Sequence, residues 1–183
     1  MANRFRISAA GALLLCGLTA GCDSRVVETD GTGAGNDRGL LGPGAVAPPI
    51  AASGWINGPG PAAEDLKEKV VVIDFWASWC GPCREKAPEI VAAHRRYRDR
   101  GVVFLGLTPD GENKLPESED FVREAQIEWP NGYGEKAYAT MEAFRVTTIP
   151  TVYVIGRDGR VVWHNWTGEG GDLEDAIQQA LGE

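Results

Sequence analysis

The chain has 183 residues, of which 43% are hydrophobic and 24% charged, and its formal net charge is −8. These values are ordinary for a soluble globular protein and fit one domain of usual size with extensions. The acidic balance provides no broad basic surface, which argues against nucleic-acid binding and against a general preference for anionic lipid.

The N-terminus carries the features of an export signal. Arg4 and Arg6 precede residues 7–20, an uncharged stretch with the length of a signal-peptide core. The run that ends at Cys22 resembles the lipobox of bacterial lipoproteins, in which cleavage before the cysteine exposes it for lipid modification. We therefore expect a lipoprotein signal peptide over residues 1–21, a lipid anchor on Cys22 and a position on the periplasmic side of the cell membrane. A signal peptide cleaved elsewhere, which would release a free protein, is the alternative.

Residues 22–46 are rich in Gly, Asp, Thr and Asn and poor in apolar side chains. Such a segment buries too little surface to offset the entropy of ordering, so we predict a flexible tether. The folded domain is expected over residues 47–183. It begins with a short strand near residues 54–58 and a single helical turn within 62–69.

A central strand is predicted for Val70–Phe75, an apolar run interrupted only by Asp74, as expected of a strand buried on both faces. Helical sequence starts near Pro82 and ends at Gly101. Residues 102–107 form a second apolar strand. Strand, helix and strand in this order imply a right-handed crossover and parallel pairing.

Residues 108–146 separate this unit from the next strand. They contain a polar loop, a helix over 117–126, an irregular stretch over 127–134 and a helix over 137–144.

The C-terminal part is typical of a hairpin followed by a helix. Strands over 151–155 and 161–166 flank a turn that contains Asp158 and Gly159. Asp172 caps a final amphipathic helix. Together the elements predict an α/β fold with a central mixed β-sheet and helices on both faces.

Cys80 and Cys83 form a Cys-x-x-Cys motif where the first strand gives way to a helix, which is typical of a thioredoxin-like redox motif. Backbone N–H groups and the helix dipole would stabilise a Cys80 thiolate, and Cys83 lies nearly one turn further on. An inert disulfide and a zinc site are the alternatives. Zinc needs two more ligands, and the only histidines are His94 and His164, without a paired spacing. We expect His94 half-exposed on its helix and His164 facing solvent.

The chain from about residue 47 onward resembles thioredoxin-fold thiol–disulfide oxidoreductases, most closely the membrane-anchored TlpA/ResA group. The resemblance lies in four motifs, in this order: Asp74-Phe75-Trp76, Trp79-Cys80-Gly81-Pro82-Cys83, Thr148-Ile149-Pro150-Thr151 and Asp158-Gly159. It implies a thioredoxin-like fold with an insertion, residues 108–146, between the second core strand and the cis-proline strand.

The resemblance also implies roles for individual residues. Cys80 would be the nucleophile that forms a mixed disulfide with substrate, and Cys83 the residue that resolves it. Asp74 matches the buried aspartate of thioredoxin that assists proton transfer, and burial should raise its pKa. A carboxylate satisfied by local hydrogen bonds is the alternative. Many members of the group carry Asn in place of Asp74 and Glu in place of Lys86, so no base role is assigned to Lys86.

A substrate-binding surface is implied beside the cysteines. Pro150 matches the cis-proline of the fold, where the backbone of Ile149 can pair with an extended substrate segment. The flanking Trp79, Gly81 and Pro82 complete the expected surface. The resemblance implies no cofactor and no metal.

The expected function is reduction of protein disulfides outside the cytoplasm, with electrons resupplied by a membrane thiol-reductant donor. Cytochrome c maturation is a favoured role in the group. A peroxiredoxin-like peroxidase is one alternative, but it would require Thr in place of Ala77. A non-enzymatic thioredoxin-fold lipoprotein that binds partners or metal is another.

Overall fold

A computed structural model describes residues 39–168 and 170–183. The predicted signal peptide over residues 1–21, the lipidation site Cys22 and most of the predicted tether lie outside the described residues. Within the described part of the chain, no helix has the length and apolar composition that a membrane span requires.

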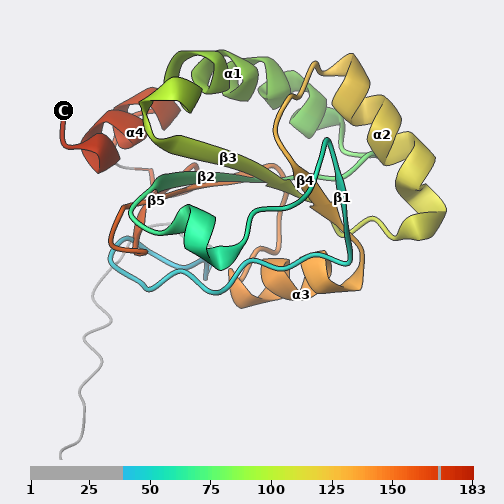
Figure 1. Cartoon of the computed structure of the whole chain (residues 1–183), viewed down its shortest axis with the longest axis horizontal. Coiled ribbons are helices and arrows are strands. Elements are labelled where there is room, and N and C mark those ends of the chain that lie inside the picture. The colour runs from blue at the N-terminus through green and yellow to red at the C-terminus, as the bar shows by residue number, and fades with distance from the viewer. Residues whose placement is uncertain (1–38, 169) are drawn as a thin grey trace, which may run out of the picture. The chain divides into compact units, whose positions relative to one another are not determined.

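Six strands form one mixed sheet in the order β1-β4-β3-β2-β5-β6 (Figure 1). Their bounds are β1 Gly54–Ile56, β2 Val70–Phe75, β3 Val102–Leu107, β4 Asn131–Tyr133, β5 Thr151–Ile155 and β6 Val161–His164. The central strand β2 pairs in parallel with β3 and antiparallel with β5, and every residue of it is buried. The predicted central strand and mixed sheet are confirmed.

The strand directions bring four strand ends to one edge of the sheet. Because β2 and β3 are parallel, Phe75 and Leu107 end at the same edge. Since β5 runs antiparallel to β2, and β6 antiparallel to β5, Thr151 begins and His164 ends there as well. We call this the carboxyl edge of β2. Loops attached to it are close in space although they are far apart in sequence.

Helices cover both faces of the sheet (Figure 1). Their bounds are α1 Gly81–Tyr97, α2 Leu115–Glu124, α3 Glu135–Ala143 and α4 Leu173–Leu181. Alternate residues of β2 point to opposite faces. Val70 and Val72 belong to the cluster with α1, α2 and α4, whereas Ile73 and Phe75 belong to the cluster with α3.

The prediction of an irregular stretch over residues 127–134 was wrong, because this stretch contains β4. The Asn-Gly sequence of β4 is typical of a turn, but its backbone pairs with β1 and β3. The fully buried Asn131 accepts a hydrogen bond of 3.0 Å from the indole Nε1 of Trp76. A side chain on Gly106 of β3 would collide with the Asn131 amide. Tertiary contacts therefore override the local turn signal.

Both histidines are buried, so their predicted exposure was wrong. His94 packs its ring against Phe104 and Trp129, with ring centroids 5.2 and 5.0 Å apart. Desolvation lowers the pKa of His94, which favours a neutral ring in this apolar cluster. His164 is fully buried, and its ring lies 5.3 Å from that of Tyr153. Neither histidine faces solvent because each continues the apolar pattern of its element.

The end of the predicted tether belongs to the folded domain. Leu40 is buried against the face of the sheet that α3 covers. The backbone N–H of Leu41 donates to the hydroxyl of Tyr153 at 3.0 Å, and Val46 forms a β-bridge with Arg160. Composition missed this because a few apolar side chains and backbone hydrogen bonds, rather than overall hydrophobicity, hold the segment.

The burial of Leu40 predicts how its replacement changes the free energy of unfolding. Replacing Leu40 with alanine should lower the free energy of unfolding by about 2 kcal/mol, because it removes a buried side chain and leaves a cavity. Urea unfolding of the full chain measures the change. Val46→Ala is the matched control, since Val46 is 65% exposed, and its effect should stay within about 0.5 kcal/mol. Equal effects of both substitutions would contradict the packing of Leu40.

Candidate functional site

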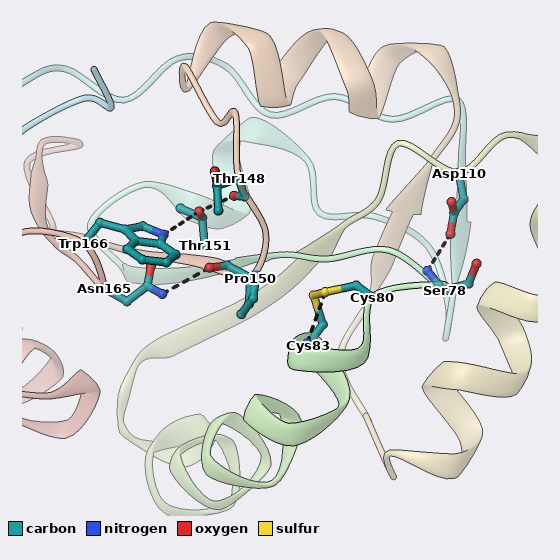
Figure 2. Close-up of a disulfide and its surroundings, with 9 residues drawn as sticks. All are labelled: Ser78, Cys80, Cys83, Asp110, Thr148, Pro150, Thr151, Asn165 and Trp166. Carbon is teal, nitrogen blue, oxygen red and sulfur yellow. Dashed lines mark hydrogen bonds between the residues drawn. A yellow bond between two sulfur atoms is a disulfide. The ribbon is translucent and has the colours of Figure 1, made fainter. Parts of the chain in front are cut away.

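A disulfide joins Cys80 and Cys83 at the carboxyl edge of β2 (Figure 2). Cys80 is the N-cap residue of α1, and the backbone N–H of Cys83 donates to the Cys80 sulfur at 3.1 Å. After reduction, this N–H and the positive end of the helix dipole would stabilise negative charge on Cys80. The arrangement therefore distinguishes Cys80 from Cys83 as the sulfur suited to nucleophilic attack.

The surface around the disulfide consists of residues that the sequence singled out. Cys80 and Cys83 are only 4% and 3% exposed, whereas Trp79 is 70% exposed. Gly81 and Pro82 are also exposed. The disulfide is thus largely covered, and exposed residues border it.

Pro150 lies across from the disulfide in Figure 2. The Ile149–Pro150 peptide bond is cis, which confirms the predicted cis-proline. Ile149 and Pro150 are both half-buried.

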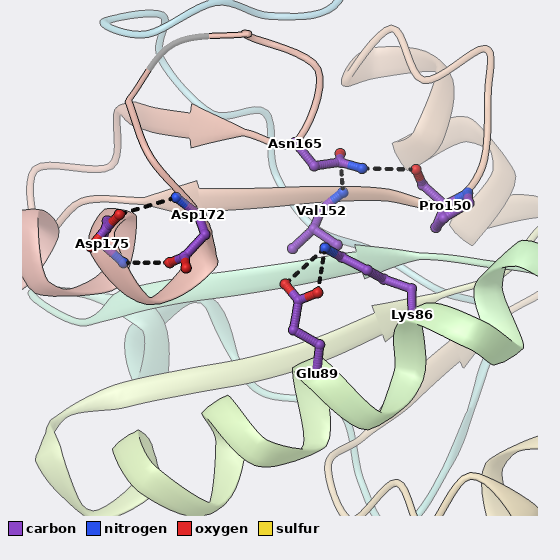
Figure 3. A network of polar contacts seen from close by, with 7 residues as sticks. All are labelled: Lys86, Glu89, Pro150, Val152, Asn165, Asp172 and Asp175. Atoms are coloured by element: carbon purple, nitrogen blue, oxygen red, sulfur yellow. Dashed lines mark hydrogen bonds and ion pairs between the residues drawn. The ribbon is translucent and has the colours of Figure 1, made fainter.

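Two side chains just after β6 hold the cis-proline segment in place (Figures 2 and 3). The Asn165 amide accepts a hydrogen bond from Val152 N at 2.9 Å and donates one to Pro150 O at 3.2 Å. The indole Nε1 of Trp166 donates to the Thr151 hydroxyl at 3.0 Å. These contacts continue the pairing of β5 with β6 and fix the start of β5 beside the disulfide.

Asp74 is buried on β2, as its sequence context predicted, and is 4% exposed. Desolvation raises the pKa of Asp74 to about 7, and the positive charge of Lys86 opposes part of this rise. By strand alternation its side chain points to the same face as Val72, which belongs to the cluster that contains Cys83. Within the described residues, no hydrogen-bond partner reaches Asp74 Oδ1. A carboxyl group with a pKa of about 7 exchanges its proton near neutral pH.

Lys86 acts on Asp74 through its charge. Its Nζ is 2.7 Å from both carboxylate oxygens of Glu89, one turn further along α1 (Figure 3). Lys86 can therefore act as a fixed charge above β2.

Three polar residues at the site escaped the sequence analysis: Asp110, Asn131 and Asn165. Each follows or begins a strand at or near the carboxyl edge of β2. The signal that could have found Asp110 is its place just beyond a strand that ends at this edge. Asn165 lay inside the strand predicted over residues 161–166, whereas β6 ends at His164. Asn131 lay in a stretch with no predicted strand, so the same reasoning did not apply to it.

Among residues 39–168 and 170–183, no group of three His, Cys, Asp or Glu side chains is placed to hold a metal ion.

Comparisons with known proteins agree with this geometry. Residues 43–164 match the model of the AhpC/TSA family. Over 99 residues the chain is 30% identical to the thiol-disulfide oxidoreductase ResA of Bacillus cereus, a match that covers 54% of this chain and 56% of that protein. It is 35% identical to protein DipZ of Mycobacterium bovis over 72% of this chain and 20% of that protein. The chain thus spans about half or less of the length of these relatives.

A solved structure supports the fold as well. The thiol-disulfide isomerase of Corynebacterium glutamicum superposes with a TM-score of 0.60 at 26% identity, covering 75% of this chain and 97% of that one. The predicted thioredoxin-like fold and the resemblance to ResA-type oxidoreductases are therefore confirmed.

Proposed function

Because this chain belongs to the AhpC/TSA family, we propose that it is an extracytoplasmic thiol–disulfide oxidoreductase that reduces protein disulfides through Cys80 and Cys83. The observation that carries the proposal is the position of Cys80. The Cys80 sulfur accepts a hydrogen bond from the Cys83 N–H at the N-terminus of α1. It also lies opposite a cis-proline segment whose backbone can pair with an extended substrate.

The reaction proceeds by two exchanges of sulfur. The Cys80 thiolate bonds to one sulfur of a substrate disulfide, and the other substrate sulfur leaves as a thiolate and takes a proton. Cys83, deprotonated, then attacks the Cys80 sulfur of the mixed disulfide and releases the second substrate sulfur. Two electrons have passed from the protein dithiol to the substrate, and the Cys80–Cys83 disulfide remains.

Asp74 is proposed to move the proton of the resolving step. Cys83 must lose a proton before it can attack, and a carboxylate with a pKa of about 7 can accept one at neutral pH. Lys86 then stabilises the charged form of Asp74, which keeps that pKa near the working range.

The proposed partners are those that a dithiol–disulfide cycle of this kind would use. Disulfide-containing proteins are the substrates, and a membrane thiol-reductant donor supplies two electrons and two protons to restore the dithiol. We propose that residues 1–21 direct export, that a lipid on Cys22 anchors the chain at the periplasmic side of the cell membrane, and that cytochrome c maturation is a role to test. The extracytoplasmic proposal rests on the signal-like sequence and on the ResA and DipZ relatives.

The reduction potential tests the direction of transfer. Equilibration of the full chain with glutathione buffers should give a value below about −200 mV, because Cys-Gly-Pro-Cys resembles the motif of thioredoxin, whose potential is about −270 mV. The reduced chain should also cleave the disulfides of a model protein. A potential above about −150 mV would indicate an oxidase instead. Rapid turnover of peroxide with no disulfide reduction would favour the peroxidase.

A further inference from the structure

The insertion contacts the redox motif at several points. We call residues 76–80, which join β2 to α1, the redox loop. Trp76 at its start donates to Asn131 and stacks on Phe121 of α2, with ring centroids 4.4 Å apart. Ser78 in its middle donates its backbone N–H to Asp110 Oδ2 at 2.8 Å (Figure 2). The insertion therefore packs against one side of the redox loop.

Asp110 is itself fixed by a dense set of hydrogen bonds. It is 6% exposed, and its Oδ2 also accepts the hydroxyl of Ser118 at 3.0 Å. Its backbone N–H donates to the hydroxyl of Thr108, and its carbonyl accepts from Gly134 N at 2.8 Å. Turning the carboxylate away from Ser78 would also break its hydrogen bond with Ser118.

A neutral side chain could hold Ser78 in place at a lower desolvation cost than a carboxylate. The Ser78 N–H needs only an acceptor, and the amide of Asn131 fulfils that task for Trp76 nearby. Burying a carboxylate costs more free energy than burying an amide that makes the same hydrogen bonds. Holding Ser78 in place therefore does not by itself explain the charge of Asp110.

That charge lies close to the nucleophile. Cys80 follows Ser78 by two residues, a span of at most about 7 Å between Cα atoms. A negative charge near a thiol disfavours its thiolate. At roughly 10 Å and an effective dielectric of about 20, Coulomb's law gives an effect of about tenfold on the ionisation equilibrium.

We propose that Asp110 is a positioning residue of the redox site: its carboxylate holds Ser78 in place and, as a negative charge beside the redox loop, disfavours the Cys80 thiolate. The inference rests on the proposed dithiol–disulfide cycle. A destabilised thiolate destabilises the reduced protein, so the dithiol gives up its electrons more readily. The insertion thereby makes the site a stronger reductant.

Asp110→Asn in the full chain separates charge from anchoring. The amide oxygen can accept the same two hydrogen bonds, whereas the charge is lost. The readout is the equilibrium in which one protein disulfide and two glutathione thiols give one protein dithiol and one glutathione disulfide. At pH 8 the variant should be about three- to tenfold more reduced than the wild type, which corresponds to about 15–30 mV. The pH profile of Cys80 alkylation should shift to lower pH.

Two further variants complete the design. Asp120→Asn makes the same chemical change at an exposed position of α2 and should leave the equilibrium unchanged. Asp110→Ser removes the charge in a different geometry and should shift the equilibrium in the same direction as Asp110→Asn.

The outcomes separate this inference from the proposed function. If the wild type equilibrates with glutathione but both Asp110 variants match Asp120→Asn, the inference is overturned and the redox function stands. If the wild-type disulfide does not equilibrate with glutathione, the proposed function fails and the inference fails with it.

Discussion

Replacing Cys80 with serine should abolish disulfide reduction, with a loss of at least about 10³-fold in turnover. The serine hydroxyl is not ionised near neutral pH, so neither the helix N-terminus nor the Cys83 N–H can make it a comparable nucleophile. Cys83→Ser should behave differently. Cys80 would still attack, but the mixed disulfide could no longer be resolved from within the protein.

The two variants are distinguished by what they capture. Cys83→Ser should accumulate covalent complexes with a disulfide-bonded model protein, visible on a non-reducing gel and released by dithiothreitol. Cys80→Ser should accumulate few, and the double variant none. More complexes on Cys80→Ser than on Cys83→Ser would assign the attack to Cys83 and contradict the proposed order.

Replacing Asp74 with asparagine should change how stability depends on pH. Burial raises the pKa of Asp74 to about 7 in the folded protein, whereas an unfolded aspartate titrates near 3.9. Between these values the folded state binds a proton that the unfolded state does not. The stabilisation is therefore complete below about pH 4 and lost as pH rises through 7. A difference of about three pKa units corresponds to about 4 kcal/mol.

Urea unfolding of the oxidised protein at pH 5 and pH 8 measures this effect. The wild type should lose stability over this interval, and Asp74→Asn should lose about 2–3 kcal/mol less, because part of the titration lies below pH 5. Asp120→Asn, at an exposed position, should follow the wild type. Parallel pH profiles of the wild type and Asp74→Asn would show that Asp74 does not titrate in this range.

The central elements could be predicted because local and global signals agree. Val70–Phe75 is apolar throughout, and the structure covers both of its faces. The same agreement allowed Cys80 to be predicted at the start of α1 and Pro150 just before β5. In contrast, Asn131–Tyr133 has the sequence of a turn, and only its neighbours β1 and β3 make it a strand.

The site could be predicted where chemistry is written into a short motif and not where it depends on tertiary contacts. Cys80, Cys83 and Asp74 lie within ten residues of each other. Asp110 and Asn165 reach the same site from loops far along the chain, and each acts through backbone groups of other segments. No local pattern marks a residue whose partner is a distant N–H. Strand direction is the only sequence-level guide to such contacts.

The contacts of Leu40 and Val46 limit how far the domain can be truncated from its N-terminal side. The sequence Ala47-Pro48-Pro49 invites a fragment that begins at residue 47. Such a fragment would lose the Leu40 side chain, which packs against the α3 face of the sheet, and the backbone hydrogen bonds of Val161 with Gly44 and Ala45. The smallest unit that keeps the native packing therefore begins no later than Gly39, and proteases should spare the segment that follows it.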